Sequence, residues 1–210
     1  MQSLKGIFFR DIENDHLYEI IKEMYHDKVY DPFLKGKKDL TIIDIGANVG
    51  IFTLYAYDKA KIIYAVEPSA QHYETLITQL AFNNLMNAVP LQVAVSHEDG
   101  EQNFYHNDNS TMFSLKAEVN GIPGEVEKVR TVTMETLFKE NKIDHVDFMK
   151  LDVEGVENLI IGSKGFENVA DKIDVIVGEF HTWSGINHKQ FETTLIDLGF
   201  EFTWLNKTEA

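Results

Sequence analysis

Apolar positions along this chain of 210 residues follow two periods, one typical of buried strands and one typical of helices. Short apolar runs predict strands over residues 41–45, 61–66, 89–95, 146–151 and 173–178. Between them, apolar residues at helical spacing predict helices over residues 15–26, 49–59, 69–83, 134–140, 156–164 and 191–198. This alternation predicts an α/β fold with a doubly wound, mostly parallel sheet that is covered on both faces.

Three segments add to that alternation. Residues 97–125 are rich in Gly, Asn, Asp and Ser and contain strand-like patches, so we expect a small hairpin insertion there. Residues 126–132 alternate apolar and charged positions, which predicts a half-exposed strand, and residues 200–205 predict a final strand. Because no linker or repeat interrupts the chain, we expect an N-terminal helical segment (1–39) followed by one domain (40–210).

Acidic residues dominate the charge of the chain. Asp and Glu number 34 against 19 Lys and Arg, a formal net charge of −15, which argues against a nucleic-acid partner because phosphate contacts need clustered cations. The sequence has no Cys, which excludes disulfides, thiolate nucleophiles and Cys-based metal sites. No apolar stretch approaches the roughly 20 residues of a membrane span, and the N-terminal apolar run is short for a signal peptide. We therefore expect no membrane association and a cytoplasmic location.

The stretch Asp44-Ile-Gly-Ala-Asn-Val-Gly50 follows the first predicted strand, and the second strand ends at Glu67. A strand, a glycine turn, a helix and an acid at the tip of the next strand predict a nucleoside site. A dinucleotide site needs a further glycine between Gly46 and Gly50, so that a pyrophosphate can bind at the helix N-terminus. Asp44 would repel a pyrophosphate, whereas a carboxylate suits the ammonium and sulfonium of S-adenosylmethionine. The residues therefore favour S-adenosylmethionine over a dinucleotide.

Acids also follow the other predicted strands, at the edge where open α/β sheets bind ligands. The acids and the histidine at these strand ends are Glu67, Asp152, Glu154, Glu179 and His181. Acids in such positions can instead cap the helix that follows, and we adopt that interpretation for Glu157 and Asp171. Position and spacing favour functional roles for Asp44, Glu67 and Asp152.

Three motifs together resemble one known family: Asp44-Ile-Gly-Ala-Asn-Val-Gly50, Glu67-Pro68-Ser69 and Lys150-Leu-Asp-Val-Glu-Gly155. With the Glu-x-His end of strand 173–178, they resemble the FkbM-type S-adenosylmethionine-dependent methyltransferases over about residues 40–200. The glycine motif is shared by many Rossmann-like methyltransferases, whereas the Lys-x-Asp-x-Glu-Gly motif is much more specific. The resemblance implies a Rossmann-like sheet of the class I methyltransferase type, S-adenosylmethionine as cofactor, and O-methylation of sugar or polyketide hydroxyls.

The resemblance also implies a set of cofactor-binding residues. They are Asp44, Gly46, Ala47, Asn48, Gly50, Glu67, Pro68, Ala94, Ser96 and Asp152. Within this set, residues 46–48 would line the methionine part, Glu67 would accept both ribose hydroxyls, and residues 94–96 would flank the adenine. Ser110 and Thr111 fall where the family has a small hydroxyl-rich stretch.

The expected catalytic residues are His181, Asp152, Glu179 and Glu154. A hydroxyl acceptor must lose its proton, and His181 is the candidate base, with Glu179 or Glu154 orienting it. Two alternatives stay open: a histidine that only hydrogen-bonds within the fold, or a divalent metal held by Asp152, Glu179 and His181. No metal ligands are assigned. Trp183 would either wall an acceptor pocket or lie in the core.

The leading hypothesis is an O-methyltransferase for a small-molecule hydroxyl. An N-methyltransferase is weaker, because the segment after strand 146–151 lacks the Asn/Asp-Pro-Pro-aromatic turn that such enzymes often have. Two further hypotheses are a nicotinamide-dependent oxidoreductase and a catalytically silent nucleoside-binding or scaffold protein. The family sheet ends in an antiparallel strand. Residues 126–132 or a partner subunit would supply it, or the sheet is shortened, so a homo-oligomer is also considered.

Overall fold

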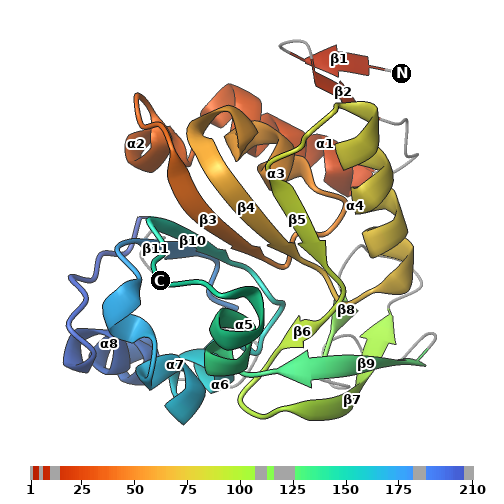
Figure 1. Cartoon of the computed structure of the whole chain (residues 1–210). Coiled ribbons are helices and arrows are strands. Elements are labelled where there is room, and N and C mark those ends of the chain that lie inside the picture. The colour runs from red at the N-terminus through yellow and green to blue at the C-terminus, as the bar shows by residue number, and fades with distance from the viewer. Residues whose placement is uncertain are drawn as a thin grey trace.

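The structure is a computed structural model that describes residues 2–4, 7–9, 15–106, 113–115, 126–181 and 188–205. At its centre lies a sheet of β3 (Leu40–Ile45), β4 (Ala60–Val66), β5 (Ala88–Leu91), β10 (Phe148–Leu151) and β11 (Ile176–Gly178). The strand order is β11-β10-β3-β4-β5, and neighbouring strands are parallel (Figure 1). The predicted α/β fold with a mostly parallel sheet is confirmed.

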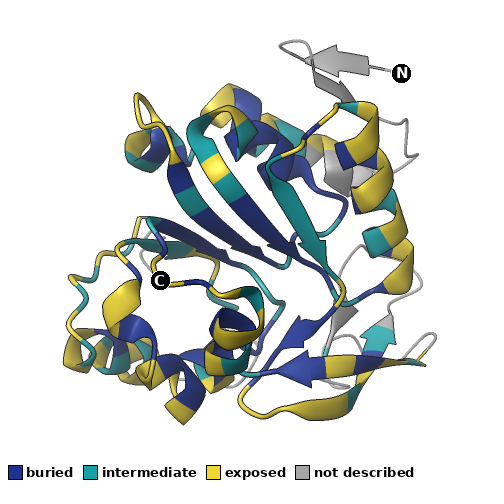
Figure 2. Ribbon diagram, viewed as in Figure 1, coloured by how far each residue is buried: buried dark blue, intermediate teal, exposed yellow. Residues whose placement is uncertain are grey.

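Helices cover both faces of this sheet. One face carries α1 (Asp15–Lys22), the π-helix η1 (Glu23–Asp27), α2 (Asp31–Leu34), α3 (Ile51–Ala56), the 3-10 turn η2 (Tyr57–Lys59) and α4 (Ala70–Phe82). The other face carries α5 (Met134–Asn141), α6 (Glu157–Ile161), α7 (Lys164–Glu167), the 3-10 turn η3 (Ala170–Lys172) and α8 (His188–Asp197). Successive side chains of a strand point to opposite faces, so Ile42 packs with the first group of helices and Ile43 with the second. The middle strands are therefore largely buried (Figure 2).

A second sheet lies beside the first one (Figure 1). Its strands are β6 (Ala94–Val95), β7 (Gly100–His106), β8 (Phe113–Ser114) and β9 (Val126–Val132), in the order β6-β9-β7-β8. The expected hairpin insertion is therefore part of a sheet in which β9 pairs with β6 and β7. The suggestion that residues 126–132 complete the edge of the parallel sheet is wrong for this reason. A small antiparallel pair, β1 (Gln2–Leu4) and β2 (Ile7–Phe9), precedes α1.

The predicted strand 89–95 is divided between the two sheets. β5 ends at Leu91 in the parallel sheet, and β6 pairs with β9 in the second sheet. Pro90 has no N–H to donate, which is tolerated because β5 is the edge strand of its sheet. An apolar run that serves two sheets in turn looks the same in sequence as one long strand.

Residues 200–205 do not form the predicted final strand. The amide of Phe200 bonds back to the last turn of α8, at 3.0 Å from the Leu195 carbonyl oxygen. Phe202 then packs on Phe191, and Trp204 packs on Phe202 with ring centroids 4.8 Å apart. The apolar pattern is thus explained by aromatic packing against α8. The parallel sheet has five strands within the described residues.

The N-terminal segment shares a hydrophobic core with the sheet. Leu34 is fully buried, and the ring of Tyr30 packs edge-on against Phe52 and Phe148, with centroids 4.9 and 6.3 Å away. This packing fixes η1, which follows α1 without a break. Single π-helical turns are frequent at functional sites, and η1 borders the cavity described below.

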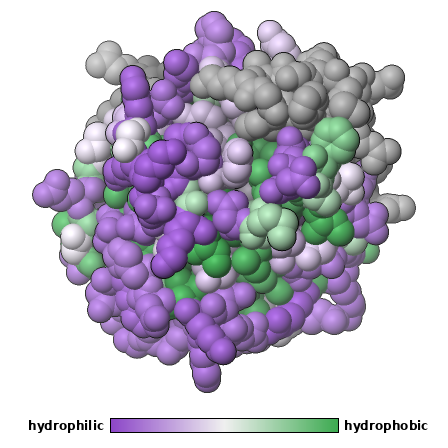
Figure 3. Space-filling view, turned by 45° about the horizontal axis from the view of Figure 1, so that its top comes forward, coloured by the Kyte–Doolittle hydropathy of each residue, from purple (hydrophilic) through white to green (hydrophobic). Residues whose placement is uncertain are grey.

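The face of the molecule drawn in Figure 3 is mainly hydrophilic, in keeping with the acidic composition. Figure 3 shows hydrophilic residues over most of one face and hydrophobic residues gathered near its middle. Among the helices of the described ranges, none combines the length and the apolar character that crossing a membrane requires.

Candidate active site

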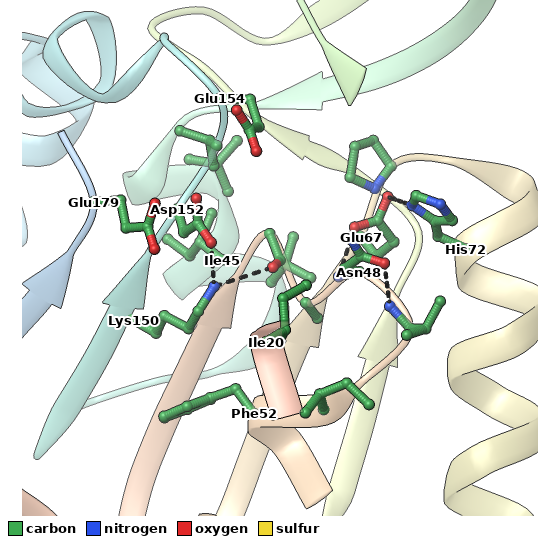
Figure 4. A pocket seen from close by; sticks show the side chains of 18 of the residues that line it. Ile20, Ile45, Asn48, Phe52, Glu67, His72, Lys150, Asp152, Glu154 and Glu179 are labelled. Carbon is green, nitrogen blue, oxygen red and sulfur yellow. Dashed lines mark hydrogen bonds and ion pairs between the residues drawn. The ribbon is translucent and has the colours of Figure 1, made fainter. Parts of the chain in front are cut away.

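A cavity of about 510 Å³ lies where β3, β4, β10 and β11 end (Figure 4). Its wall contains the turn of residues 46–49, the residues that follow β4 and β10, and side chains of the N-terminal segment. Among the described residues, six carboxylates line it against two lysines: Glu23, Asp27, Glu67, Asp152, Glu154 and Glu179 against Lys22 and Lys150. A cavity with such an excess of negative charge favours a cationic ligand.

The turn after β3 is held between the ends of two neighbouring strands. The amides of Gly46 and Ala47 donate to the carbonyl oxygen of Val66, at 3.0 and 2.9 Å. Gly46 has a φ of 79°, and a Cβ at this position would lie 1.7 Å from the carbonyl oxygen of Asp152. Only glycine allows this approach, so the backbone of Asp152 accounts for the glycine at this position of the turn.

Glu67 fastens the turn to the end of β4. Its Oε2 accepts from the amide of Asn48 at 2.9 Å, and its Oε1 accepts from the amide of Ser69 at 2.9 Å. Burial raises the pKa of Glu67 to about 7, although these two hydrogen bonds act in the opposite direction. Nδ1 of His72 lies 3.9 Å from Oε1. Each carboxylate oxygen has two lone pairs, so both retain the capacity to accept from a ligand hydroxyl.

Lys150 connects two acids below the turn. Its Nζ donates to Oδ2 of Asp152 at 2.9 Å and to the carbonyl oxygen of Gly46 at 3.3 Å, and it lies 3.9 Å from Oδ1 of Asp44. Burial alone would lower the pKa of Lys150, but the charges of Asp152 and Asp44 raise it above its ordinary value. The hydroxyl of Thr53 donates to Oδ2 of Asp44 at 2.7 Å. Burial raises the pKa of Asp44, and Lys150 opposes this shift.

His181 lies among three glutamates behind the cavity wall. Its Nδ1 is 2.7 Å from Oε1 of Glu157, and its Nε2 is 3.3 Å from Oε2 of Glu154 and 3.8 Å from Oε2 of Glu179. Burial alone would lower the pKa of His181, but the hydrogen bond with Glu157 and the surrounding carboxylates raise it to about 9. The imidazole of the free protein is therefore protonated at neutral pH.

Glu154 and Glu179 separate His181 from the cavity. Glu154 has a φ of 52°, a left-handed conformation that is rare for a residue with a Cβ and that recurs at functional sites. Burial and the charge of Asp152 raise the pKa of Glu154 to about 7, and His181 opposes them. The charge of Asp152, followed by burial, also raises the pKa of Glu179. The three acids Asp152, Glu154 and Glu179 thus repel one another at the end of the cavity.

The structure brings most of the predicted residues to the cavity. The predicted residues that line it are Gly46, Ala47, Asn48, Glu67, Pro68, Ala94, Asp152, Glu154 and Glu179. Three predicted cofactor-binding residues do not line the cavity: Asp44, Gly50 and Ser96. Asp44 lies beneath the turn, and Gly50 packs against Leu76 at the start of α3. Ser96 is buried, with its Oγ 3.3 Å from Nδ1 of His97. Ser110, Thr111 and Trp183 lie outside the described residues.

Several residues of the site are not in the predicted set, among them Glu157, Lys150, Glu23 and Tyr30. The sequence position of Glu157 suggests a helix cap, but the residue is fully buried and contacts His181 as well as the amide of Gly155. Lys150 belongs to one of the family motifs, and its signal is a charged residue inside an otherwise apolar strand. Glu23 and Tyr30 reach the cavity from the N-terminal segment, where the sequence carries no signal for them.

These residues fit S-adenosylmethionine. The carboxyl oxygens of Glu67 can accept hydrogen bonds from the hydroxyls of a ribose, and the carboxylate of Asp152 suits an ammonium group. Val93, Ala94 and Phe104 give the cavity an apolar wall that an adenine can contact. The excess of acids matches a cofactor that carries a sulfonium.

Comparisons with known proteins agree with this fit. The family model described as "Methyltransferase FkbM domain" matches residues 44–202. The chain is 29% identical over 220 residues to methyltransferase sdnD of Sordaria araneosa, covering 88% of this chain and 82% of that protein. It is 26% identical over 182 residues to methyltransferase 1 of Beauveria bassiana strain ARSEF 2860, covering 76% and 72%.

Among solved structures, the chain is similar to precorrin 8w decarboxylase of Methanobacterium thermoautotrophicum, with a TM-score of 0.49 and 15% identity over 91% of this chain and 75% of that chain. It is also similar to precorrin-6y C5,15-methyltransferase of Geobacter metallireducens, with a TM-score of 0.47 and 14% identity over 95% and 77%. The family match covers both the glycine turn and the acids after β10 and β11. The chain therefore belongs to the family of FkbM-type S-adenosylmethionine-dependent methyltransferases.

Proposed function

We propose that the protein transfers a methyl group from S-adenosylmethionine to a hydroxyl of a small molecule, such as a sugar or a polyketide. The observation that carries this proposal is the cluster of Asp152, Glu154, Glu179 and His181 at one end of the cavity. Carboxylates can hold a hydroxyl by its proton and receive that proton, and His181, with Nε2 3.3 Å from Oε2 of Glu154, holds one of these carboxylates in place.

In this proposal Glu67 binds the ribose of the cofactor, and the turn of residues 46–48 lines its methionine part. The two backbone hydrogen bonds to Glu67 fix its carboxylate before the ligand arrives, so little side-chain order is lost on binding. Lys150 holds Asp152 in the same way, at 2.9 Å. Asp152 then contacts the ammonium of the methionine part.

S-adenosylmethionine supplies the methyl group: its transfer to the hydroxyl oxygen breaks the S–CH₃ bond, leaves the electron pair on sulfur and releases the hydroxyl proton. The protein has to align the two reactants and to receive that proton. Glu154 and Glu179 line the cavity, and His181 contacts both from behind, so the cluster as a unit provides the route for the proton.

The charge of the cavity favours a hydroxyl over an amine as the acceptor. An amine among the six lining carboxylates would stay protonated, and an ammonium has no lone pair with which to attack a methyl group. The same charge disfavours a nucleic-acid acceptor, whose phosphates the carboxylates would repel. A free, uncharged polyol meets neither obstacle.

Methyl transfer from donor carrying a labelled methyl group tests this function. The panel consists of sugars, polyketide alcohols and an amine counterpart of each compound, with product analysis by mass spectrometry. The proposal expects label in an O-methyl ether that base treatment does not remove. Label only in N-methyl products would overturn the O-methyl assignment, and the absence of any turnover together with the absence of S-adenosylhomocysteine binding would overturn the whole proposal.

A further inference from the structure

We propose that Asp152, Glu154 and His181 form a binding site for a divalent metal ion at the end of the cavity. One donor atom from each residue, two carboxylate oxygens and one ring nitrogen, lies within 4.8 Å of the other two. Ligand atoms at about 2.1 Å from an ion are at most about 4.2 Å apart, so small side-chain movements complete the site. Binding of the ion is independent of the proposed function, whereas the role given to the ion below rests on it.

The orientation of His181 is the first argument. Histidines that bind metals usually donate their other ring N–H to a carboxylate, which fixes the ring and the tautomer. Glu157 occupies that position: it is fully buried, and its Oε1 lies 2.7 Å from Nδ1. Nε2 is thereby directed at Oε2 of Glu154, 3.3 Å away.

The balance of charges is the second argument. Asp152, Glu154 and Glu179 crowd one end of the cavity, where Lys150 pairs with Asp152 at 2.9 Å. Glu154 and Glu179 each bring a carboxylate oxygen to within 3.8 Å of Nε2 of His181. Carboxylates this close together repel one another, and a divalent cation between them offsets that repulsion.

The backbone of Glu154 is the third argument. A left-handed conformation at a glutamate is unfavourable and persists only where the surrounding structure imposes it. Here it turns the Glu154 carboxylate toward Nε2 of His181 immediately after Asp152. Gly155, with a φ of 96°, continues the turn and donates its amide to Glu157.

The donor set indicates which ions fit. Two carboxylates suit Mg²⁺ and Mn²⁺, and one imidazole shifts the preference toward Mn²⁺ and its neighbours in the transition series. Three protein ligands leave coordination positions for water and for an acceptor oxygen. A bound ion would polarise the O–H bond of a coordinated acceptor hydroxyl. When that bond breaks, its electron pair stays on oxygen and the carboxylate of Glu179 can receive the proton. The ion keeps its oxidation state throughout.

A second cluster on the surface provides the control. His145, Asp147 and Asp174 also bring three donor atoms together, but His145 and Asp174 are exposed and Oδ2 of Asp147 already accepts from the amide of Thr41 at 2.7 Å. These residues precede β10 and β11, at the opposite end of the sheet from the cavity. A His145→Ala variant therefore removes a competing surface site without touching the cavity.

Titration of the chelator-treated full chain with Mn²⁺, followed by electron paramagnetic resonance, tests the proposal. We expect one tightly bound Mn²⁺ per chain, with nitrogen modulation from a coordinated imidazole, in both wild type and His145→Ala. Glu154→Gln and His181→Gln should each weaken binding at least about tenfold, and Glu157→Gln should weaken it by about tenfold by releasing the ring of His181. Far-UV circular dichroism establishes that each variant is folded.

Three results would overturn the proposal: no Mn²⁺ bound to the wild type, no nitrogen modulation in His145→Ala, or unchanged affinity in both ligand variants. In the first two cases the cluster is an internal ion-pair network around a protonated histidine. The nitrogen signal needs only the wild type and His145→Ala, so it decides the matter even if the ligand variants do not fold. Calorimetry with S-adenosylhomocysteine on the same samples separates the two proposals, since cofactor binding without Mn²⁺ binding rejects the metal site alone.

Discussion

Nδ1 of His181 lies 2.7 Å from Oε1 of Glu157, a carboxylate with no solvent-exposed surface. The same oxygen accepts from the amide of Gly155 at 3.1 Å. Replacing Glu157 by Ala removes the partner of both groups and leaves a buried imidazolium without its nearest anion. We expect Glu157→Ala to lower the free energy of unfolding by about 3 kcal/mol in urea denaturation.

A matched acid in the first turn of another helix separates this role from simple capping. Glu135 lies in the first turn of α5, is exposed, and accepts from Nδ2 of Asn168 at 2.8 Å. Glu135→Ala should lower the free energy of unfolding by at most about 1 kcal/mol. Equal losses in the two variants would mean that Glu157 acts only as a helix cap, as its sequence position suggests.

The ammonium of Lys150 is a second buried charge whose removal should be costly. Lys150→Met leaves Asp44 and Asp152 without the cation between them, so we expect the free energy of unfolding to fall by about 3–5 kcal/mol. Adding Asp44→Asn to Lys150→Met removes one of the two carboxylates that lost their cation. The double variant should therefore lose less free energy of unfolding than the two single variants lose together. A double-mutant cycle in urea measures this, and additive losses would contradict direct coupling of Asp44 and Lys150.

Gly46 and Gly36 allow a direct measurement of steric contact at the glycine turn. Both have a φ of 79°, but a Cβ on Gly36 meets nothing within 4 Å, whereas one on Gly46 lies 1.7 Å from the carbonyl oxygen of Asp152. Gly36→Ala should therefore lower the free energy of unfolding by about 1 kcal/mol, the cost of the backbone conformation alone. Gly46→Ala should lower the free energy of unfolding much more, and calorimetry should detect no binding of S-adenosylhomocysteine to this variant. Similar stability of the two variants would show that the turn can move away from β10.

Glu67 should make stability depend on pH in a predictable direction. Its pKa is raised from 4.5 to about 7 in the folded chain, chiefly by burial. Between these pH values the unfolded chain has lost the proton and the folded chain keeps it, so raising the pH favours unfolding. Relative to Glu67→Gln, which cannot ionise, wild type should lose on the order of 2–3 kcal/mol from pH 4.5 to pH 7.5. Urea midpoints of both proteins across this range measure the effect; parallel curves would show that Glu67 is ionised in the fold from low pH.

The sequence predicts the parts of the fold that depend on local periodicity. β3, β4 and β10 are mainly apolar runs, and α4 begins after Ser69, whose hydroxyl accepts from the amide of His72. The errors occur where apolar residues serve another purpose. Residues 94–95 leave the parallel sheet for the second one, and the aromatic residues after Gly199 pack on α8 instead of pairing.

The candidate site is predictable to the extent that strand ends define it. Glu67, Asp152, Glu154 and Glu179 line the cavity because each follows a parallel strand. Contacts that depend on distance in space are not visible in one sequence. Glu157 has the position of a helix cap and reaches His181 only because β10 and β11 are neighbours.

The central claim is that the cavity at the strand ends binds the cofactor through Glu67. Isothermal titration of the full chain with S-adenosylhomocysteine tests it most directly, with Glu74→Gln, an exposed acid on α4, as the matched control for Glu67→Gln. We predict one binding site in wild type and in Glu74→Gln, and a loss of affinity of about tenfold or more, about 1.4 kcal/mol, in Glu67→Gln. Equal affinity in all three proteins, or no binding to the wild type, would contradict the account.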